Sequence, residues 1–326
     1  MRLLVTGGCG FIGSNFIRYI LQHYGPEFVT NVDALTYAGN IANLAGIADS
    51  CGERYEFFHA DIASADQMDE VMAKHHFFAV INFAAESHVD RSINSPQHFI
   101  HTNIVGTNVL LEAARRHGVR RFVQISTDEV YGSLGPEGRF TEQSPIEPSS
   151  PYSSSKAGAD LLALAYQKTY GMEVVVTRCS NNYGPYQFPE KLIPLMILNA
   201  LHDKPLPVYG DGLNVRDWIH VEDHCAAILR VLLNGRSGEV YNIGADSERR
   251  NIDVVKTILA HLGKPDSLIG YVKDRLGHDR RYAIDSTKMH TELGWKPLHN
   301  FEQGLKDTVD WYVANRAWWE PLLKKS

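Results

Sequence analysis

Short apolar runs alternate with longer segments of helical spacing through the first half of the chain. Continuous apolar runs are typical of strands buried on both faces, and amphipathic segments predict helices. Strands alternating with helices predict βαβ units whose right-handed crossovers form a doubly wound parallel sheet, an α/β fold of the Rossmann type. We expect strands at 3–6, 28–33, 55–58, 79–83, 121–126 and 173–178, with helices at 11–24, 65–75, 96–117 and 152–170.

The rhythm changes after about residue 180, where glycine and proline become frequent and the expected elements become shorter and mixed. This change predicts a Rossmann domain at 1–180 and a smaller C-terminal substrate-binding domain at 181–326. The boundary is soft, because some segments of the second part can return to the sheet. The expected elements there are 191–201, 222–233, 239–242, 252–262 and 301–315.

Composition places the chain among folded globular proteins. Its 326 residues are 44% hydrophobic and 21% charged, which excludes a disordered chain. The net charge of −6 argues against a general nucleic-acid or anionic-membrane binder. No apolar run approaches the ~20 residues that a membrane helix needs, and we expect no leader segment.

Four widely spaced cysteines, without a C-x-x-C pair, argue against a disulfide framework or a zinc ribbon. Such cysteine usage fits a reducing cytoplasm. The fifteen histidines never form H-E-x-x-H, so we predict no metal site.

A glycine turn follows the first predicted strand. Residues 3–13 read LLVTGGCGFIG, in which Gly7, Gly10 and Gly13 leave room for the backbone to approach a pyrophosphate at a helix N-terminus. Asp33 ends the second strand, where a carboxylate accepts hydrogen bonds from a ribose diol and repels a 2′-phosphate. This pattern predicts NAD rather than NADP. The alternative is a purely structural turn with a surface aspartate.

Candidate reacting residues follow two later segments. Residues 126–132 read STDEVYG at a predicted strand end, although Ser, Thr and Asp there could simply cap the next element. Residues 151–157 read PYSSSKA, which places Tyr152 and Lys156 on one face of a helix. We expect the ammonium to lower the pKa of the phenol, so that a tyrosinate can act as a base.

Together these residues resemble the extended short-chain dehydrogenase/reductase family. Within it, AAESHVDRSI (84–93), STDEVYG (126–132) and RCSNNYGPYQFPEKLIP (178–194) are similar to the dTDP-glucose 4,6-dehydratases, as are RDWIHVEDH (216–224) and GHDRRYAID (277–285). The resemblance implies an NAD-dependent hydro-lyase of deoxysugar and rhamnose biosynthesis. It would convert dTDP-D-glucose to dTDP-4-keto-6-deoxy-D-glucose and water, with NAD tightly bound and recycled.

The resemblance also implies a role for each reacting residue. Oxidation of C4 to a ketone comes first, because it makes the C5 proton acidic. In that step Tyr152 would take the proton of the C4 hydroxyl, and Lys156 would hold Tyr152 ionised. Glu129 would then remove the C5 proton, and protonated Asp128 would donate to the leaving C6 hydroxyl. Thr127 would hydrogen-bond the C4 oxygen. Two neighbouring acids separate their pKa values, although adjacency alone does not decide which is the acid.

Binding residues carry over from the family one by one. For the cofactor the resemblance implies Gly7, Gly10, Phe11, Ile12, Gly13, Asp33, Leu35, Thr36, Asp61, Ile62, Phe83, Ala84, Ala85, Ser87, Thr102, Tyr152, Lys156 and Asn182. For the sugar nucleotide it implies Ser87, Thr127, Asp128, Glu129, Asn181, Glu190, Lys191, Leu192, Pro207, Tyr209, Arg216, Asn251, Arg275 and His278. Two positions depart from the family pattern: Cys9 replaces the usual alanine, and Leu276 replaces the usual proline.

The resemblance also implies an oligomeric state, and other functions remain as alternatives. The family pairs the helices at 96–117 and 152–170 across a two-fold axis, which implies a homodimer with a four-helix bundle. Competing hypotheses are a UDP-glucose 4,6-dehydratase, a nucleotide-sugar 4-epimerase and an NAD-binding sensor without turnover. The Asp128–Glu129 pair argues against the epimerase, and the retained Tyr152 and Lys156 argue against the sensor. The Trp318–Trp319 pair receives no role.

Overall fold

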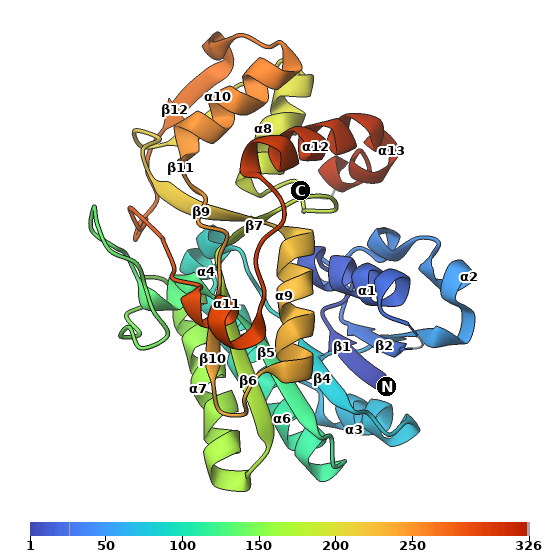
Figure 1. The fold of residues 1–326 in the computed structure, drawn as a ribbon. Coiled ribbons are helices and arrows are strands. Elements are labelled where there is room, and N and C mark those ends of the chain that lie inside the picture. Colours follow the sequence, from blue (N-terminus) through green and yellow to red (C-terminus); the bar gives the residue numbers. More distant parts are fainter. Residues whose placement is uncertain (26, 325–326) are drawn as a thin grey trace.

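The computed structural model describes residues 1–25 and 27–324. Its centre is a seven-stranded parallel sheet in the order β10-β6-β5-β4-β1-β2-β3 (Figure 1), which confirms the doubly wound α/β fold. Every strand expected in the first half is present within a residue or two of its predicted ends. The strands are β1 (Arg2–Thr6), β2 (Phe28–Asp33), β3 (Tyr55–His59), β4 (Ala79–Asn82), β5 (Arg121–Thr127), β6 (Glu173–Cys179) and β10 (Val240–Ile243).

Helices cover both faces of this sheet. One apolar cluster joins α1 and α9 to the sheet, and another joins α3, α6 and α7 to its opposite face. Both faces are therefore dry, as the unbroken apolar strands require. The helices of this layer are α1 (Phe11–His23), α2 (Ile47–Cys51), α3 (Ala65–Lys74), α4 (Val89–Asn94), α5 (Pro96–Phe99), α6 (Thr107–Arg116), α7 (Pro151–Tyr170), α9 (Val221–Asn234) and α11 (Thr287–Leu293).

The helix expected at 96–117 contains a wider turn. Residues Ile100–Gly106 form a π-helical segment between α5 and α6. Within it, Asn103 accepts a hydrogen bond from the Glu86 N–H (2.9 Å) and donates to the Glu86 carbonyl (3.0 Å). Apolar periodicity cannot reveal such a segment, because the extra residue in the turn is held by tertiary hydrogen bonds.

The second half forms a smaller body with its own apolar core. A three-stranded sheet, in the order β11-β9-β7, joins it to the main sheet, and β12 pairs with β8 beside it (Figure 1). Residues 221–243 return to the Rossmann layer as α9 and β10. The elements are β7 (Asn181–Tyr183), α8 (Leu192–Leu201), β8 (Leu206–Tyr209), β9 (Val215–His220), β11 (Glu248–Arg250), α10 (Asn251–Leu262), β12 (Ile269–Val272), α12 (Phe301–Ala314) and α13 (Arg316–Trp319).

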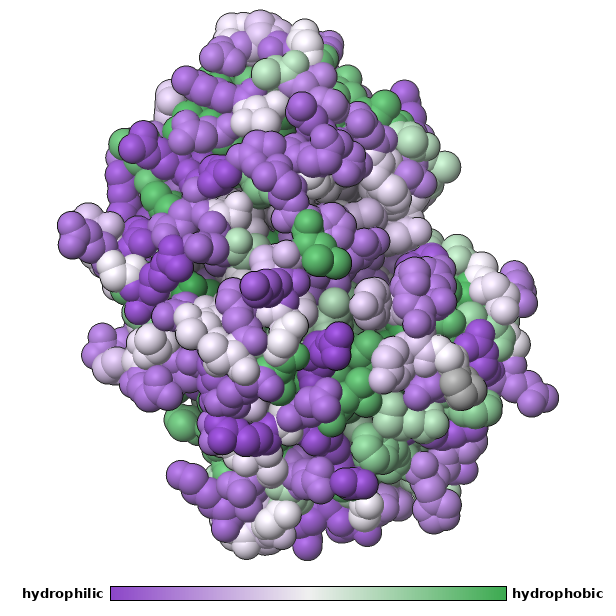
Figure 2. All heavy atoms as spheres, in the orientation of Figure 1, coloured by the Kyte–Doolittle hydropathy of each residue, from purple (hydrophilic) through white to green (hydrophobic). Residues whose placement is uncertain are grey.

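The face of the molecule shown in Figure 2 is mostly hydrophilic, with apolar residues in patches. None of the helices among the described residues has both the length and the apolar character needed to cross a membrane.

Candidate active site

A cavity of about 350 Å³ opens at the carboxyl ends of the central strands. Its walls come from both halves of the chain, as expected for a ligand site of an open α/β sheet. Most of the predicted site residues meet here: Gly7, Gly10, Phe11, Ile12, Gly13, Asp33, Thr36, Asp61, Ile62, Phe83, Ala84, Ala85, Ser87, Thr102, Thr127, Asp128, Glu129, Tyr152, Lys156, Asn181, Asn182, Glu190, Lys191 and Leu192.

The turn between β1 and α1 is closely packed against its neighbours. Gly7 has φ +69°, and a Cβ there would lie 2.5 Å from the Ala84 nitrogen. At Gly13 a Cβ would lie 2.4 Å from the Gly7 carbonyl oxygen. Glycine is therefore required at both positions, and the N-terminus of α1 is left open toward the cavity.

Asp33 ends β2 at the wall of the cavity. Its carboxylate accepts hydrogen bonds from the Cys9 and Leu35 N–H groups, both at 2.8 Å. Burial raises the pKa of Asp33, although both hydrogen bonds favour the ionised form. Each carboxylate oxygen has a second lone pair for a ligand hydroxyl.

The segment after β5 brings two carboxyl groups into the cavity. The Thr127 hydroxyl accepts from the Glu129 N–H (3.2 Å) and donates to Asp128 Oδ1 (3.3 Å). Asp128 is 2% exposed, and its Oδ2 finds no hydrogen-bond partner among the described residues. A buried carboxyl oxygen without a partner is costly when charged, so this group favours the protonated form.

The surroundings separate the two acids. Burial, followed by the charges of Glu129 and Asp217, raises the pKa of Asp128 far above its usual range. Burial also raises the pKa of Glu129, but Arg275, Lys191 and Arg216 oppose that rise. Three cations thus oppose the rise at Glu129, whereas at Asp128 two carboxylates add to the rise and only Arg216 opposes it among the charges.

Tyr152 and Lys156 lie on the first turns of α7, which begins with a Ser150–Ser153 capping box. Lys156 Nζ donates to the Ile125 carbonyl at 2.6 Å. The expected lowering of the Tyr152 pKa is wrong for this structure, because burial and then the Glu129 charge raise the pKa of the phenol. Burial also lowers the pKa of Lys156, which Asp160 partly opposes.

The opposite wall is basic and polar. Lys191 Nζ donates to the Ser87 carbonyl at 2.9 Å, which joins the second half of the chain to the segment after β4. The carboxylate of Glu190 pairs with His88 (3.4 Å) and Arg91 (3.7 Å). Asn181 Oδ1 is buried and has no hydrogen-bond partner in the described part of the chain.

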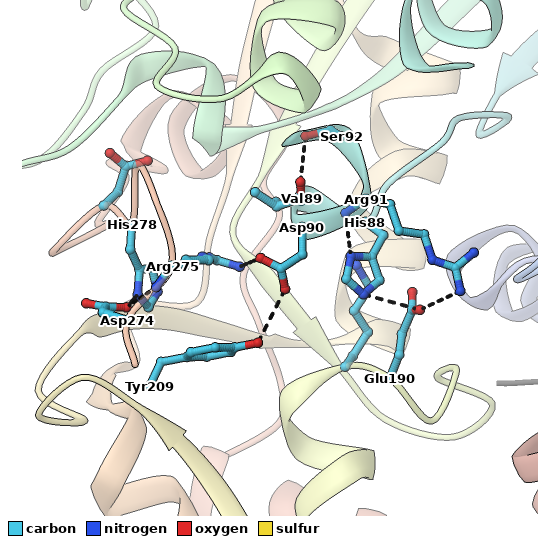
Figure 3. A network of polar contacts seen from close by, with 12 residues as sticks. His88, Val89, Asp90, Arg91, Ser92, Glu190, Tyr209, Asp274, Arg275 and His278 are labelled. Atoms are coloured by element: carbon cyan, nitrogen blue, oxygen red, sulfur yellow. Dashed lines mark hydrogen bonds and ion pairs between the residues drawn. The ribbon is translucent and has the colours of Figure 1, made fainter. Parts of the chain in front are cut away.

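A polar network closes the outer end of this wall (Figure 3). Asp90, on α4, accepts a hydrogen bond from the Tyr209 hydroxyl at 3.5 Å and lies 3.9 Å from an Arg275 nitrogen. On the same loop as Arg275, His278 contacts Asp274 at 2.5 Å. The loop that carries Arg275 and His278 in the second half thus contacts α4 of the first half.

Some predicted residues lie outside the cavity lining. Leu35 packs against the apolar core, and Arg216 stacks on the Tyr282 ring at 4.2 Å while donating to the Asp279 carbonyl. Arg216 and Arg275 still act on the site through their charges near Glu129. The complete set is Leu35, Pro207, Tyr209, Arg216, Asn251, Arg275 and His278.

Other lining residues were not predicted. Several belong to strings already singled out, such as Glu86 in 84–93 and Gln187 and Phe188 in 178–194, so their sequence context could have indicated them. Others carry no sequence signal. The unpredicted residues are Val32, Ala34, Tyr37, Ala38, Gly39, Ala60, Glu86, Ile125, Ser126, Cys179, Ser180, Gln187, Phe188, Ile193 and Trp218.

One histidine–carboxylate group lies outside the cavity. Among the described residues, His220, Glu222 and His299 have side-chain ligand atoms within 4.8 Å of one another. The two rings stack at 4.0 Å with planes 24° apart, so their in-plane lone pairs do not converge on one ion. Hydrogen bonds to Asp223 and Glu222 raise the pKa of His299 to about 9. These contacts describe an ion-pair cluster.

Comparison with known proteins then identifies the family. The chain is 55% identical to dTDP-glucose 4,6-dehydratase from Streptomyces niveus, over 99% of this chain and 96% of the relative. The chain belongs to the dTDP-glucose 4,6-dehydratase family. The broader family model, described as GDP-mannose 4,6 dehydratase, matches residues 4–308.

Solved structures place this dTDP-glucose 4,6-dehydratase family member in a wider fold group. DesIV, a dTDP-glucose 4,6-dehydratase from Streptomyces venezuelae crystallised with NAD, has a TM-score of 0.95 and 51% identity, covering 99% of this chain and 100% of that chain. UDP-glucose 4-epimerase from Thermus thermophilus has a TM-score of 0.90 at only 29% identity, covering 97% and 100%. Dehydratases and epimerases therefore share the fold, and the site must distinguish them.

Proposed function

We propose that this protein converts dTDP-D-glucose to dTDP-4-keto-6-deoxy-D-glucose and water, with NAD as a tightly held cofactor. Relatives named dTDP-glucose 4,6-dehydratase match over the full length of the chain. The single observation that carries the chemistry is a pair of adjacent carboxyl groups in the cavity, of which Asp128 is buried with an unpartnered Oδ2 and Glu129 lies near three cations. An elimination of water needs this combination of one acid and one base.

The residues of the cavity fit NAD. A Cβ would fill the glycine turn where the diphosphate must approach, and Asp33 presents its carboxylate at the end of β2. The ribose, adenine and nicotinamide contacts fall to the predicted cofactor residues that line the cavity. When bound, NAD supplies the redox chemistry by accepting hydride from C4 and returning it to C6 of the sugar.

Proton transfers fall to the residues around β5 and α7. Tyr152 takes the proton of the C4 hydroxyl, with Thr127 bonded to the same oxygen and Lys156 one turn further along α7. Glu129 removes the C5 proton, which the C4 ketone has made acidic. Asp128 then protonates the C6 hydroxyl, so that the C6–O bond breaks and water leaves.

The remaining protons balance the cycle. Glu129 returns its proton to C5 as hydride reaches C6. Tyr152 then loses to solvent the proton that it took from the C4 hydroxyl, and Asp128 regains a proton from solvent. The sugar ends as a C4 ketone with a C6 methyl group.

Within residues 181–326, the part outside 221–243 forms the sugar-nucleotide side of this proposal, since 221–243 return to the Rossmann layer. Lys191, Arg216 and Arg275 place positive charge near Glu129 and suit a diphosphate. Pro207 and Tyr209 would flank the base, with Asn181, Glu190, Leu192, Asn251 and His278 as further contacts. The protein would act in the cytoplasm, in keeping with its four free cysteines.

The active form would be a homodimer. Ile100, Val105 and Leu161 are 49%, 42% and 57% exposed, and they belong to two helical segments that pack side by side. A four-helix bundle formed with a second copy would cover these apolar side chains.

The test uses purified protein with dTDP-glucose carrying deuterium at C4, with UDP-glucose as the parallel substrate. We expect a 4-keto-6-deoxy product with deuterium on its methyl group, formed faster from the thymidine nucleotide. Loss of the deuterium to solvent, or a C4 epimer without water loss, contradicts the proposal. Faster turnover of UDP-glucose assigns the uridine nucleotide instead.

A further inference from the structure

The C-terminal segment reaches back to the nucleotide end of the Rossmann layer. Helix α13 lies on the same side of the molecule as α1 (Figure 1), and Trp318 Nε1 donates a hydrogen bond to Asn43 Oδ1 at 2.9 Å. The two residues are 275 positions apart in sequence. No motif in the sequence indicated this contact, and the proposed mechanism does not use it.

Asn43 transmits the contact to the glycine turn. It is 2% exposed, and its Nδ2 donates to the Cys9 carbonyl at 2.9 Å. The Asn40 N–H donates to the same carbonyl at 2.9 Å, and the Cys9 N–H donates to Asp33 at 2.8 Å. The backbone N–H and the carbonyl of Cys9 are therefore both hydrogen-bonded, and the next residue, Gly10, is the N-cap of α1.

Aromatic and cationic contacts hold the C-terminal side of this connection. Arg18 Nε donates to the Asn43 carbonyl at 2.8 Å, and its guanidinium lies 4.8 Å from the Tyr186 ring centre. Tyr186 in turn packs edge-on against Trp318, with ring centres 5.6 Å apart. The Trp318 indole is thus held by the Tyr186 ring as well as by its hydrogen bond to Asn43.

We propose that Trp318 is a positioning residue for the cofactor site, a proposal that rests on the proposed NAD-dependent function. An indole N–H only donates, so it holds the Asn43 amide with Oδ1 toward Trp318 and Nδ2 toward the Cys9 carbonyl. Without that donor the buried Oδ1 loses its partner, and the amide is free to turn. The peptides that face the diphosphate then lose a fixed orientation, and NAD is released more readily.

The test compares Trp318→Phe with the matched control Trp319→Phe. Each change removes one indole N–H and keeps an aromatic ring, but the Trp319 N–H donates to the Tyr312 carbonyl at 2.7 Å, within the C-terminal segment. NAD release is followed as exchange of bound NAD against an excess of isotopically labelled NAD. We expect release roughly three- to ten-fold faster in W318F, the range of one hydrogen bond, and the parent rate in W319F.

Thermal unfolding with and without added NAD separates positioning from general destabilisation. We expect both variants to unfold at lower temperature than the parent protein, but only W318F to show a smaller NAD-dependent rise. Asn43→Asp provides a second variant, because it keeps the oxygen that faces Trp318 and replaces the donor to Cys9. It should also release NAD faster.

The outcomes distinguish the two proposals. A parent protein that retains no NAD contradicts the proposed function and this inference with it. A parent protein that retains NAD, with W318F releasing it at the parent rate or no faster than W319F, overturns this inference alone.

Discussion

Placement, rather than residue type, separates the two acids next to β5. Asp128 and Glu129 are adjacent, yet Arg275, Lys191 and Arg216 all oppose the pKa rise of Glu129, whereas Arg216 alone of these three opposes that of Asp128. Asp128 instead has Asp217 and Glu129 nearby, and its Oδ2 lacks a hydrogen-bond partner among the described residues. The sequence places these acids at a strand end, but their division of labour needs cations that arrive from the second half of the chain.

Glu129→Gln should stop the reaction after oxidation of C4. A neutral amide cannot take the C5 proton, so we expect dehydration to fall at least about 100-fold, a typical contribution of general base catalysis. Reduced nicotinamide should still form, and its absorbance follows that half of the reaction. An unimpaired rate of dehydration shows that Glu129 has another role.

Asp128→Asn provides the matched control, because it keeps Glu129 and removes only the acid. Dehydration should fall here too, but the sugar C5 position should exchange with deuterated solvent, which mass spectrometry detects. Glu129→Gln should show no such exchange. The opposite pattern reverses the two assignments.

Elements followed the hydrophobic pattern closely, with informative exceptions. The strand expected at 28–33 is β2, and the helix expected at 65–75 is α3 less its last residue, because unbroken or periodic apolar runs determine both. The π-helical segment at Ile100–Gly106 could not be predicted, since Asn103 holds it through the backbone of Glu86. The return of β10 to the main sheet also depends on tertiary pairing, here with β6.

Just before α12, His299 pairs with the carboxylates of Asp223 and Glu222, and this pairing makes the stability of the fold depend on pH. Hydrogen bonds to Asp223 and Glu222 raise the pKa of His299 to about 9 from 6.5, and Asp223 also accepts the Leu298 and His299 N–H groups. A raised pKa stabilises the folded state fully below pH 6.5, and the contribution is lost as the pH rises through about 9.

His299→Gln should therefore reduce the free energy of unfolding at pH 6.5, on the order of 1–2 kcal/mol after allowance for solvent screening. The difference from the parent protein should shrink toward zero above about pH 9. Urea unfolding at several pH values measures it, with His76→Gln as an exposed control. A difference that does not change with pH contradicts the ion-pair explanation.

At the scale of the whole molecule, the sequence predicted the positions of the site motifs on the sheet, but not the contacts between the two halves of the chain. The glycine turn, the strand end at 126–129 and the helix at 151–170 could be placed from motifs, because each marks the carboxyl edge of a parallel sheet. The contact of Asp90 with Tyr209 and Arg275, shown in Figure 3, joins residues more than a hundred positions apart. No local pattern could indicate such pairs.

The proposed dimer also belongs to this scale. Leu161 is 57% exposed in the middle of α7, the helix whose first turns carry Tyr152 and Lys156. In a two-fold interface one substitution is present twice, so Leu161→Glu would place two carboxylates in an apolar contact. We expect L161E to sediment as a monomer at concentrations where the parent protein is a dimer, while its far-UV circular dichroism is unchanged.

Leu298→Glu is the matched control, because Leu298 is 88% exposed and lies outside those helices. It introduces the same charge on the same residue type, so it should leave the parent assembly intact. If L161E sediments like the parent protein, the exposed face of α7 is not the subunit interface. If L298E dissociates the parent assembly instead, the interface lies near the start of α12 and not at the exposed face of α7.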